Sequence, residues 1–171
     1  MTRLCLALLF ILTASCSSNS NKTPKETSSP NIYSEIDSIQ KSITEGKILP
    51  KDMIVVDSNG DSIEFGEILN ESTIYVRFSS YGCKDCIDFV LDRLTKSCKK
   101  FVILVSEMPV REMYINERSN PKIKMYKVSK MGIDFDEGLT PVLFKEENLR
   151  VKDFFIPHRE SAEYLEEYLS K

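Results

Sequence analysis

The chain has 171 residues, 42% of them hydrophobic and 29% charged, which is enough apolar material for one globular domain with tails. The net charge is −3 with acids and bases interspersed, so we exclude a nucleic-acid partner, because phosphate binding needs clustered positive charge. The single histidine argues against a multi-histidine metal site and removes the usual general base of hydrolases. We therefore expect neither a metal nor another cofactor.

The first residues have the build of a secretory signal. Residues 1–3 carry a positive charge, residues 4–12 form an apolar run, and small residues precede Cys16. The run is too short for a permanent membrane-spanning helix. Small residues followed directly by cysteine resemble the lipobox of bacterial lipoproteins, which implies a signal peptide over residues 1–15 and a diacylglycerol on the sulfur of Cys16. The alternative is a plain signal peptide in which Cys16 is incidental.

A polar segment follows the signal. Residues 17–30 are rich in Ser, Asn, Lys, Thr and Pro, and such a segment cannot bury enough surface to offset its ordering entropy. We expect a flexible linker over residues 16–30 and one folded domain over residues 31–171, with a helical extension over 31–50. This organisation predicts an extracytoplasmic (periplasmic) protein held at a membrane by its lipid, in a compartment where disulfides persist.

The domain should begin with a helix and a hairpin. Four isoleucines between residues 32 and 43 recur at spacings of four, three and four, which indicates one apolar face of a helix that ends near Gly46. We expect this face either to pack on the domain or to bind a partner. Residues 53–57 and 62–65 read as two strands joined through Asn59-Gly60, a pair suited to the positive φ of a tight turn.

Strands and helices alternate in the rest of the chain. Residues 73–79 form a β-rich apolar run, and the continuous run over 101–106 is typical of a central strand covered on both faces. Cys98 continues the apolar face of the helix after residue 86, so we expect it in the core. The other expected elements are helices over 87–98, 109–118 and 162–169, and strands over 122–128, 141–145 and 151–156. The alternation predicts an α/β sandwich with a mixed central sheet and flanking helices.

The motif that carries chemistry is Cys83-Lys84-Asp85-Cys86, between the strand over 73–79 and a helix. Near the first helical turn, unpaired N–H groups and the helix dipole favour an anion, so we expect the pKa of the Cys83 thiol to fall and its thiolate to attack disulfides. Lys84 adds positive charge and Asp85 partly offsets it. Cys86, one turn further on, can attack a mixed disulfide from within.

The cysteine pair at a strand-to-helix junction, the strand over 101–106 and the sequence LTPVLF over 139–144 together resemble the thioredoxin superfamily. The resemblance covers roughly residues 53–171 and is greatest to the membrane-anchored, extracytoplasmic thiol-disulfide oxidoreductases. It implies a thioredoxin-like three-layer sandwich. It also implies activity on protein disulfides or dithiols of exported proteins.

The resemblance assigns roles to individual residues. Cys83 would be the nucleophile and Cys86 the resolving thiol. Pro141 would follow a cis peptide bond and pack beside the cysteine pair, and the backbone of Thr140 would pair with an extended substrate. A cis X-Pro bond is rare enough to need a reason, and substrate docking would supply one.

Two positions depart from the family's pattern. Gly82 stands where the family has Trp before the first cysteine, and Arg77 stands where it often has a buried acid. Arg77 either points toward the sulfurs, where it would stabilise the Cys83 thiolate, or points away and pairs with a carboxylate. The departures leave open a non-catalytic binding domain of a membrane-associated assembly. Independently of them, the cysteine pair could form an inert structural disulfide. The sequence leaves the oligomeric state open.

Overall fold

The computed structural model describes residues 32–133 and 138–171. The signal segment, Cys16 and the linker over 16–30 lie outside the described residues, so the lipoprotein hypothesis stays a prediction. Within the described ranges, no helix has both the length and the apolar character needed to cross a membrane.

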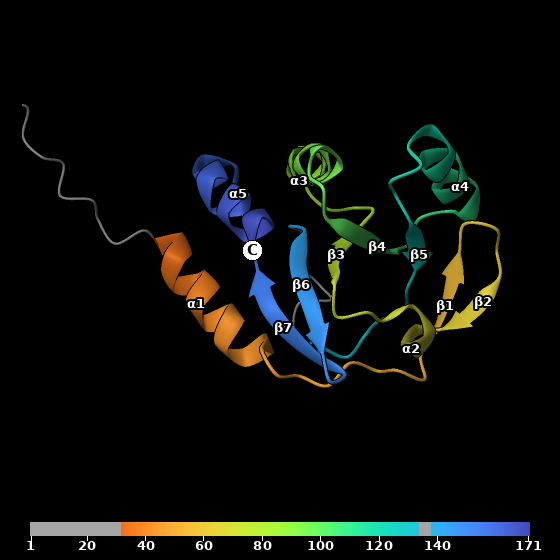
Figure 1. The fold of residues 1–171 in the computed structure, drawn as a ribbon, viewed down its shortest axis with the longest axis horizontal. Helices are drawn as coiled ribbons and strands as arrows, with labels where there is room; N and C mark the ends of the chain where they lie inside the picture. The colour runs from red at the N-terminus through yellow and green to blue at the C-terminus, as the bar shows by residue number, and fades with distance from the viewer. Residues whose placement is uncertain (1–31, 134–137) are drawn as a thin grey trace, which may run out of the picture.

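Seven strands form one mixed sheet in the order β2-β1-β5-β4-β3-β6-β7 (Figure 1). The neighbours β3, β4 and β5 run parallel, and all other neighbouring pairs run antiparallel. The strands are β1 Ile54–Asp57, β2 Ser62–Glu64, β3 Thr73–Ser79, β4 Lys100–Ser106, β5 Met125–Lys127, β6 Val142–Glu147 and β7 Arg150–Phe155. The apolar run over 101–106 is therefore the middle strand, as its composition predicts.

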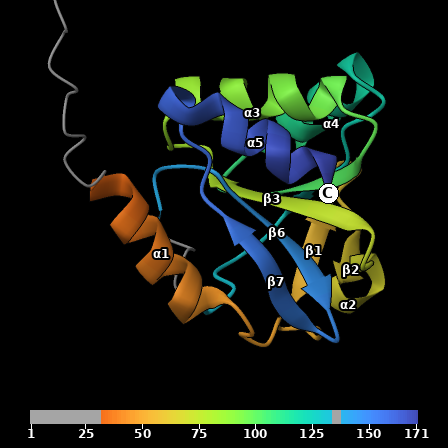
Figure 2. The same cartoon turned by 60° about the vertical axis from the view of Figure 1, so that its left-hand side comes forward.

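Helices flank the sheet. They are α1 Ile32–Thr44, α2 Phe65–Ile68, α3 Lys84–Lys96, α4 Val110–Ser119 and α5 Ala162–Ser170, with a 3₁₀ turn at Arg159–Ser161. Helices α3, α4 and α5 lie on one side of the sheet, and α1 runs beside the edge strand β7 (Figures 1 and 2). The expected α/β sandwich with a mixed sheet is confirmed. The single-turn helix α2 was not expected.

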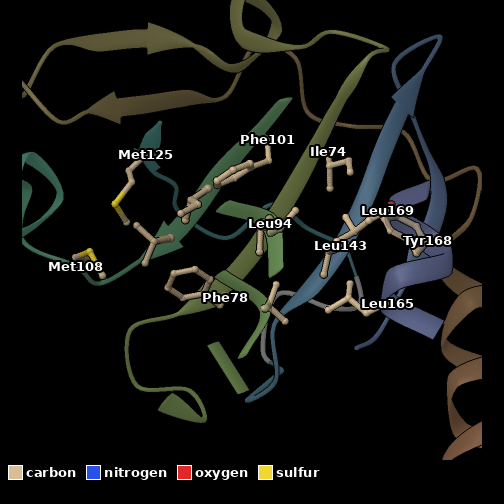
Figure 3. Packing of buried hydrophobic residues seen from close by; sticks show 14 of the residues in the cluster. Ile74, Phe78, Leu94, Phe101, Met108, Met125, Leu143, Leu165, Tyr168 and Leu169 are labelled. Atoms are coloured by element: carbon tan, nitrogen blue, oxygen red, sulfur yellow. The ribbon is translucent and has the colours of Figure 1, made fainter. Parts of the chain in front are cut away.

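The core on the face of α3, α4 and α5 follows from strand alternation. Ile74, Val76 and Phe78 of β3 project to this face, because alternate residues of a strand share one side. Ile74 and Phe78 are labelled in Figure 3. They pack against the apolar stripes of the three helices, which supply Val90, Leu94, Met113, Leu165, Tyr168 and Leu169. This packing fixes α3, and with it the cysteine pair, over the end of β3.

The opposite face is covered by α2 and loops. Tyr75 of β3 lies between Phe65 and Phe144, with ring centroids 6.4 and 5.3 Å away. Its hydroxyl donates to the Ile68 carbonyl at 2.9 Å and accepts from the Asn70 N–H at 2.7 Å. Burial raises the pKa of Tyr75 to about 12. The tyrosine therefore ties β3 to the segment that precedes it.

Helix α1 contacts the domain with its polar face. His158 Nε2 lies 2.7 Å from Asp37 Oδ2, and Glu45 Oε1 accepts from the Phe154 N–H at 2.7 Å. Three isoleucines of the apolar face are open to solvent, with exposed fractions of 50%, 54% and 41% at Ile36, Ile39 and Ile43. The helix was correctly predicted. The expectation that its apolar face packs on the domain is wrong.

Helix α3 ends at Lys96, two residues earlier than its apolar spacing suggests. The N–H of Ser97 donates to the carbonyls of Arg93 and Leu94, both at 3.0 Å, and its hydroxyl donates to the Leu94 carbonyl at 2.8 Å. Cys98 therefore lies beyond the helix and is exposed. The expectation of a core position for Cys98 is wrong, because this cap ends the helix before its periodicity can bring residue 98 inward.

Candidate functional site

The cysteine pair lies at the N-terminus of α3, as expected. Cys83 is the N-cap residue, and it forms a disulfide with Cys86 across a Cα–Cα distance of 5.3 Å. The N–H of Cys86 donates to Cys83 Sγ at 3.3 Å and to the Cys83 carbonyl at 3.1 Å. Both cysteines are half-buried. A thiolate formed on Cys83 would thus receive a helix N–H and the favourable end of the helix dipole.

The loop between β3 and Cys83 is short, and hydrogen bonds hold its backbone in place. Ser79 ends β3, and its carbonyl accepts from the Gly82 N–H at 2.9 Å, while its hydroxyl accepts from the Tyr81 N–H at 3.2 Å. The N–H of Ser80 donates to the Ser106 carbonyl at 3.3 Å. These bonds set where the chain enters α3 and therefore where the nucleophilic sulfur lies.

Glu107 supports this loop, although the sequence reasoning missed it. Its carboxylate accepts from the hydroxyls of Ser79 and Ser106, both at 2.8 Å, and so joins the ends of the paired strands β3 and β4. Hydrogen bonds from Ser106 and then Ser79 lower the pKa of Glu107. Its φ of 58° lies in the left-handed region, which non-glycine residues rarely adopt. No signal in the sequence could have found it, because its role depends on two strands that end side by side in the sheet.

The segment before β6 lies against the cysteine loop. The N–H of Cys83 donates to the Leu139 carbonyl at 2.7 Å. A Cβ at Gly82 would lie 2.6 Å from the Leu139 oxygen, closer than real Cβ contacts, and 3.0 Å from the Ser79 oxygen, which is tighter than most. Any side chain at this position, including the Trp of the family that the sequence resembles, would force the backbone to shift. The close approach places Thr140, which follows Leu139, next to the cysteine pair.

The Thr140–Pro141 peptide bond is trans, since no cis bond occurs in the described residues. The expectation of a cis bond is therefore wrong. Trans is the lower-energy form of an X-Pro bond. The segment before β6 lies against the cysteine loop with this bond in the trans form. Pro141 directly precedes β6, whose Val142 pairs with Arg77 of β3. This pairing, rather than a cis turn, holds the segment at the site.

Arg77 lies on the sheet face opposite α3. It follows Tyr75 by two residues in β3 and so shares its face, and it lines a pocket with Glu107 and Lys127. Its side chain is 3% exposed, and Nη1 donates to the Phe78 carbonyl at 2.8 Å. The positive charge of Arg77 also contributes to the lowered pKa of Glu107. The Arg77 side chain therefore points away from the sulfurs, on the sheet face opposite α3.

Two charged residues lie between the cysteines. Lys84 is exposed, and Asp85 Oδ2 lies 3.4 Å from Nη1 of Arg159, which the sequence reasoning did not connect with the site. Arg159 offsets part of the negative charge of Asp85. Less of that negative charge is then left to compensate the positive charge of Lys84. Both members of the Asp85–Arg159 pair are exposed, so water and salt weaken this effect.

A pocket of about 540 Å³ opens beside the cysteine loop, between α3 and α4. Gly82 and Lys84 line its end at the site, and Ile87 and Leu91 line its α3 wall. Glu112 of α4 lies on the opposite wall. The pocket therefore offers apolar surface next to the disulfide. Within residues 32–133 and 138–171, no cluster of three or more His, Cys, Asp or Glu side chains is placed to hold a metal ion.

Comparison with known proteins identifies the fold class. No family model matches the chain, and no curated protein sequence matches it. Two solved structures from Aquifex aeolicus VF5, described as electron transport and electron transfer proteins, align with TM-scores of 0.52 and 0.51 at 13% and 14% identity. Each alignment covers 74% of this chain, and 96% and 92% of the respective structures.

A thio-disulfide isomerase of Thermus thermophilus aligns at 18% identity, over 75% of this chain and 96% of that one, with a TM-score of 0.48. At these identities the alignments show the fold alone. The comparison rests on the two Aquifex structures, whose TM-scores are 0.52 and 0.51. The chain has a thioredoxin-like fold: a mixed central sheet with flanking helices and a cysteine pair at the start of α3.

Proposed function

We propose that this protein is a thiol-disulfide oxidoreductase that acts on exported proteins, with Cys83 as the nucleophile and Cys86 as the resolving thiol. One observation carries the proposal: Cys83 Sγ lies at the N-cap of α3 and accepts the Cys86 N–H at 3.3 Å. This position stabilises the thiolate form, which is the form that reacts with disulfides. A disulfide that served only to staple the fold would have no use for a stabilised thiolate.

The exchange proceeds in two steps in the reducing direction. The Cys83 thiolate attacks one sulfur of the client disulfide, so a mixed disulfide forms and the other client sulfur leaves as a thiolate. The Cys86 thiolate then attacks Cys83 Sγ, the client's second thiolate leaves, and the Cys83–Cys86 disulfide remains. The client gains two electrons and the protein loses two. A partner dithiol protein restores the reduced pair, and the same steps in reverse oxidise a client.

The residues around the pair take supporting roles in this proposal. The Leu139 carbonyl binds the Cys83 amide, so the backbone of Thr140 and Pro141 lies where an extended client segment can pair with it. Lys84 stabilises the thiolate electrostatically, and Asp85 moderates that effect within its pair with Arg159. Arg77 acts from the opposite sheet face, through the Glu107 carboxylate that supports the loop.

The cellular setting in the proposal rests on the sequence. A signal peptide over residues 1–15, a lipid on Cys16 and the linker over 16–30 would hold the domain near a membrane, outside the cytoplasm. Exported proteins with disulfides or dithiols would then be the clients within reach. Metabolic labelling with a palmitate analogue tests the anchor, since Cys16→Ser should abolish the label and Cys98→Ser should not.

Turnover assays on variants test the proposed chemistry. Cys83→Ser should abolish reduction of insulin disulfides, and Cys86→Ser should accumulate the mixed disulfide because the second step has no resolving thiol. Cys98→Ser is the matched control, since Cys98 is an exposed thiol outside the site, and it should retain full activity. Unchanged insulin reduction by Cys83→Ser would contradict the proposal.

A non-catalytic binding domain is the second candidate, and the outward isoleucines of α1 favour it. Such a domain needs no reactive thiol, so the alkylation rate of Cys83 should follow the ordinary thiol pKa of about 8.5. A working oxidoreductase should instead show rapid alkylation of Cys83 well below that pH. The pH profile of Cys83 alkylation in the reduced protein therefore separates the two candidates.

A further inference from the structure

The isoleucine row of α1, formed by Ile36, Ile39 and Ile43, is an uncovered apolar face at one edge of the molecule. Each of the three side chains is between 41% and 54% exposed. Because they recur at spacings of three and four residues, they lie on one side of the helix. In both views of the fold, β7 lies on one side of α1 and no described element lies on the other (Figures 1 and 2). Three exposed isoleucines in one row indicate a contact surface for another molecule.

Contacts on the opposite side of α1 keep the isoleucine row facing outward. Thr44 is fully buried, and Glu45 Oε1 accepts from the Phe154 N–H at 2.7 Å. The N–H of Gly46, just beyond the helix, donates to the Val151 carbonyl at 2.8 Å. A rotation of α1 that turned the isoleucines toward the domain would break these bonds and expose Thr44. The row is therefore available to another molecule.

The spacing of the isoleucine row fits a second helix of the same kind. Ile36, Ile39 and Ile43 occupy the a, d and a positions of a heptad repeat, whose side chains interdigitate between two paired helices. Isoleucine is a favoured residue at these positions, because its β-branched side chain is stiff and loses little freedom on packing. A second copy of α1 presents the same row. Two copies can therefore pack row on row about a twofold axis.

The charges beside the isoleucine row favour a second copy over a lipid surface. Among the described side chains that flank the row, which are Glu35, Gln40 and Ser42, only Glu35 is charged. Two copies meet without a block of like charge, since Glu35 faces Gln40 in a parallel helix pair and Ser42 in an antiparallel pair. A helix that lies on a membrane surface carries Lys and Arg along its polar face. Helix α1 has Glu35 and Asp37 against Lys41, so anionic lipid headgroups would not attract it.

We propose that α1 is the self-association surface of this protein, and that the isoleucine rows of two copies pack on each other in a homodimer. The proposal goes beyond the redox function and does not depend on it. Two rows of three isoleucines bury less than the roughly 1,200 Å² at which stable interfaces begin, so the dimer is weak in free solution. On a membrane, the proposed linker over 16–30 and the lipid on Cys16 would confine the copies to one surface and raise their effective concentration.

Sedimentation velocity tests the proposal on residues 17–171, a chain that contains every described residue of the fold. Blocking Cys98 with iodoacetamide, while Cys83 and Cys86 stay oxidised, excludes an intermolecular disulfide as the cause of association. As the protein concentration rises, we expect the wild-type sedimentation coefficient to move from that of a monomer to that of a dimer. Ile39→Glu should raise the dissociation constant about tenfold or more, because it places a charge inside the packed row. Ile39→Leu should dimerise like wild type, since it keeps an apolar side chain.

Ser38→Glu is the matched control, since Ser38 is exposed on the same helix but lies outside the isoleucine row. It adds the same charge one residue away, and it should leave the dissociation constant unchanged. A wild-type chain that stays monomeric at every concentration, a dimer that Ile39→Glu leaves intact, or an equal loss in Ser38→Glu would each overturn the proposal. Flotation of a monomeric wild-type chain with phosphatidylglycerol vesicles that Ile39→Glu abolishes would also overturn it, because the row would then bind lipid.

Discussion

The backbone N–H of Cys83 donates to the carbonyl oxygen of Leu139 at 2.7 Å, and this bond joins two segments that are distant in the sequence. The sheet makes the meeting possible. Strand β3 leads into the cysteine loop, and its antiparallel neighbour β6 begins directly after Pro141. Because antiparallel strands run in opposite directions, the end of β3 lies beside the start of β6. The cysteine loop and the segment before β6 meet at that junction.

Gly82→Ala should disturb this junction. The added Cβ would lie 2.6 Å from the Leu139 oxygen, so the backbone must shift and the hydrogen bond between Cys83 and Leu139 must lengthen. We expect a loss of about 1–3 kcal/mol in the free energy of unfolding, the usual cost of forcing extra volume into a packed place. Urea unfolding measures it. Ser80→Ala, in the same loop, adds no contact and should cost less than about 0.5 kcal/mol. Equal stability of Gly82→Ala and wild type would contradict the close approach.

Glu107 should make stability depend on pH in the acid range. Hydrogen bonds from Ser106 and Ser79 lower its pKa from the ordinary value of 4.5 in the folded protein. A lowered folded pKa means that the carboxylate stabilises the fold above the unfolded pKa, and that this contribution disappears as pH falls through the folded pKa. Wild type should therefore exceed Glu107→Gln in melting temperature at pH 7, and the gap should close below about pH 4.

The control for Glu107 is Glu71→Gln, which removes an exposed carboxylate from the turn before β3. Its melting temperature should track that of wild type across the same pH range. A gap between wild type and Glu107→Gln that stays constant from pH 7 to pH 3 would mean that the Glu107 charge does not stabilise the ends of β3 and β4.

Helix α1 should tolerate loss of its isoleucines. Ile39 is 54% exposed, so Ile39→Ala should cost less than about 0.5 kcal/mol in the free energy of unfolding. Leu94 of α3 is fully buried, and Leu94→Ala should cost about 2–5 kcal/mol. Chemical denaturation of both variants checks the contrast. A cost at Ile39 comparable to that at Leu94 would show that the apolar face of α1 is buried in the protein after all.

The sequence predicts most of the elements because their patterns are local. The run TIYVRFS corresponds to β3 residue for residue, and the Asn59-Gly60 turn, with φ of 93° at Gly60, joins β1 and β2 as expected. Cys83 lies at the helix start for the same reason, since the strand, loop and helix follow one another in the chain. A local pattern is enough wherever the structure depends on neighbours in sequence.

Most of the wrong or missing predictions concern features that contacts between distant parts of the chain determine. The period of α1 reveals an apolar face but not the direction it takes, which polar contacts such as Asp37–His158 set. The error at Cys98 has a local cause instead: this residue keeps the helical spacing, yet the cap at Ser97 ends the helix first. No pattern in the sequence announces that Glu107 would join β3 and β4, because that role depends on two strands ending side by side.

The most direct test of the account is the redox equilibrium of Cys83 and Cys86 in the full-length protein. Glutathione or dithiothreitol buffers would set the potential, and alkylation followed by peptide mass would report this pair separately from the other cysteines. The account predicts one reversible two-electron transition between roughly −120 and −270 mV, the range of working oxidoreductases. A disulfide that stays closed below about −300 mV, or a pair that never closes, would contradict it.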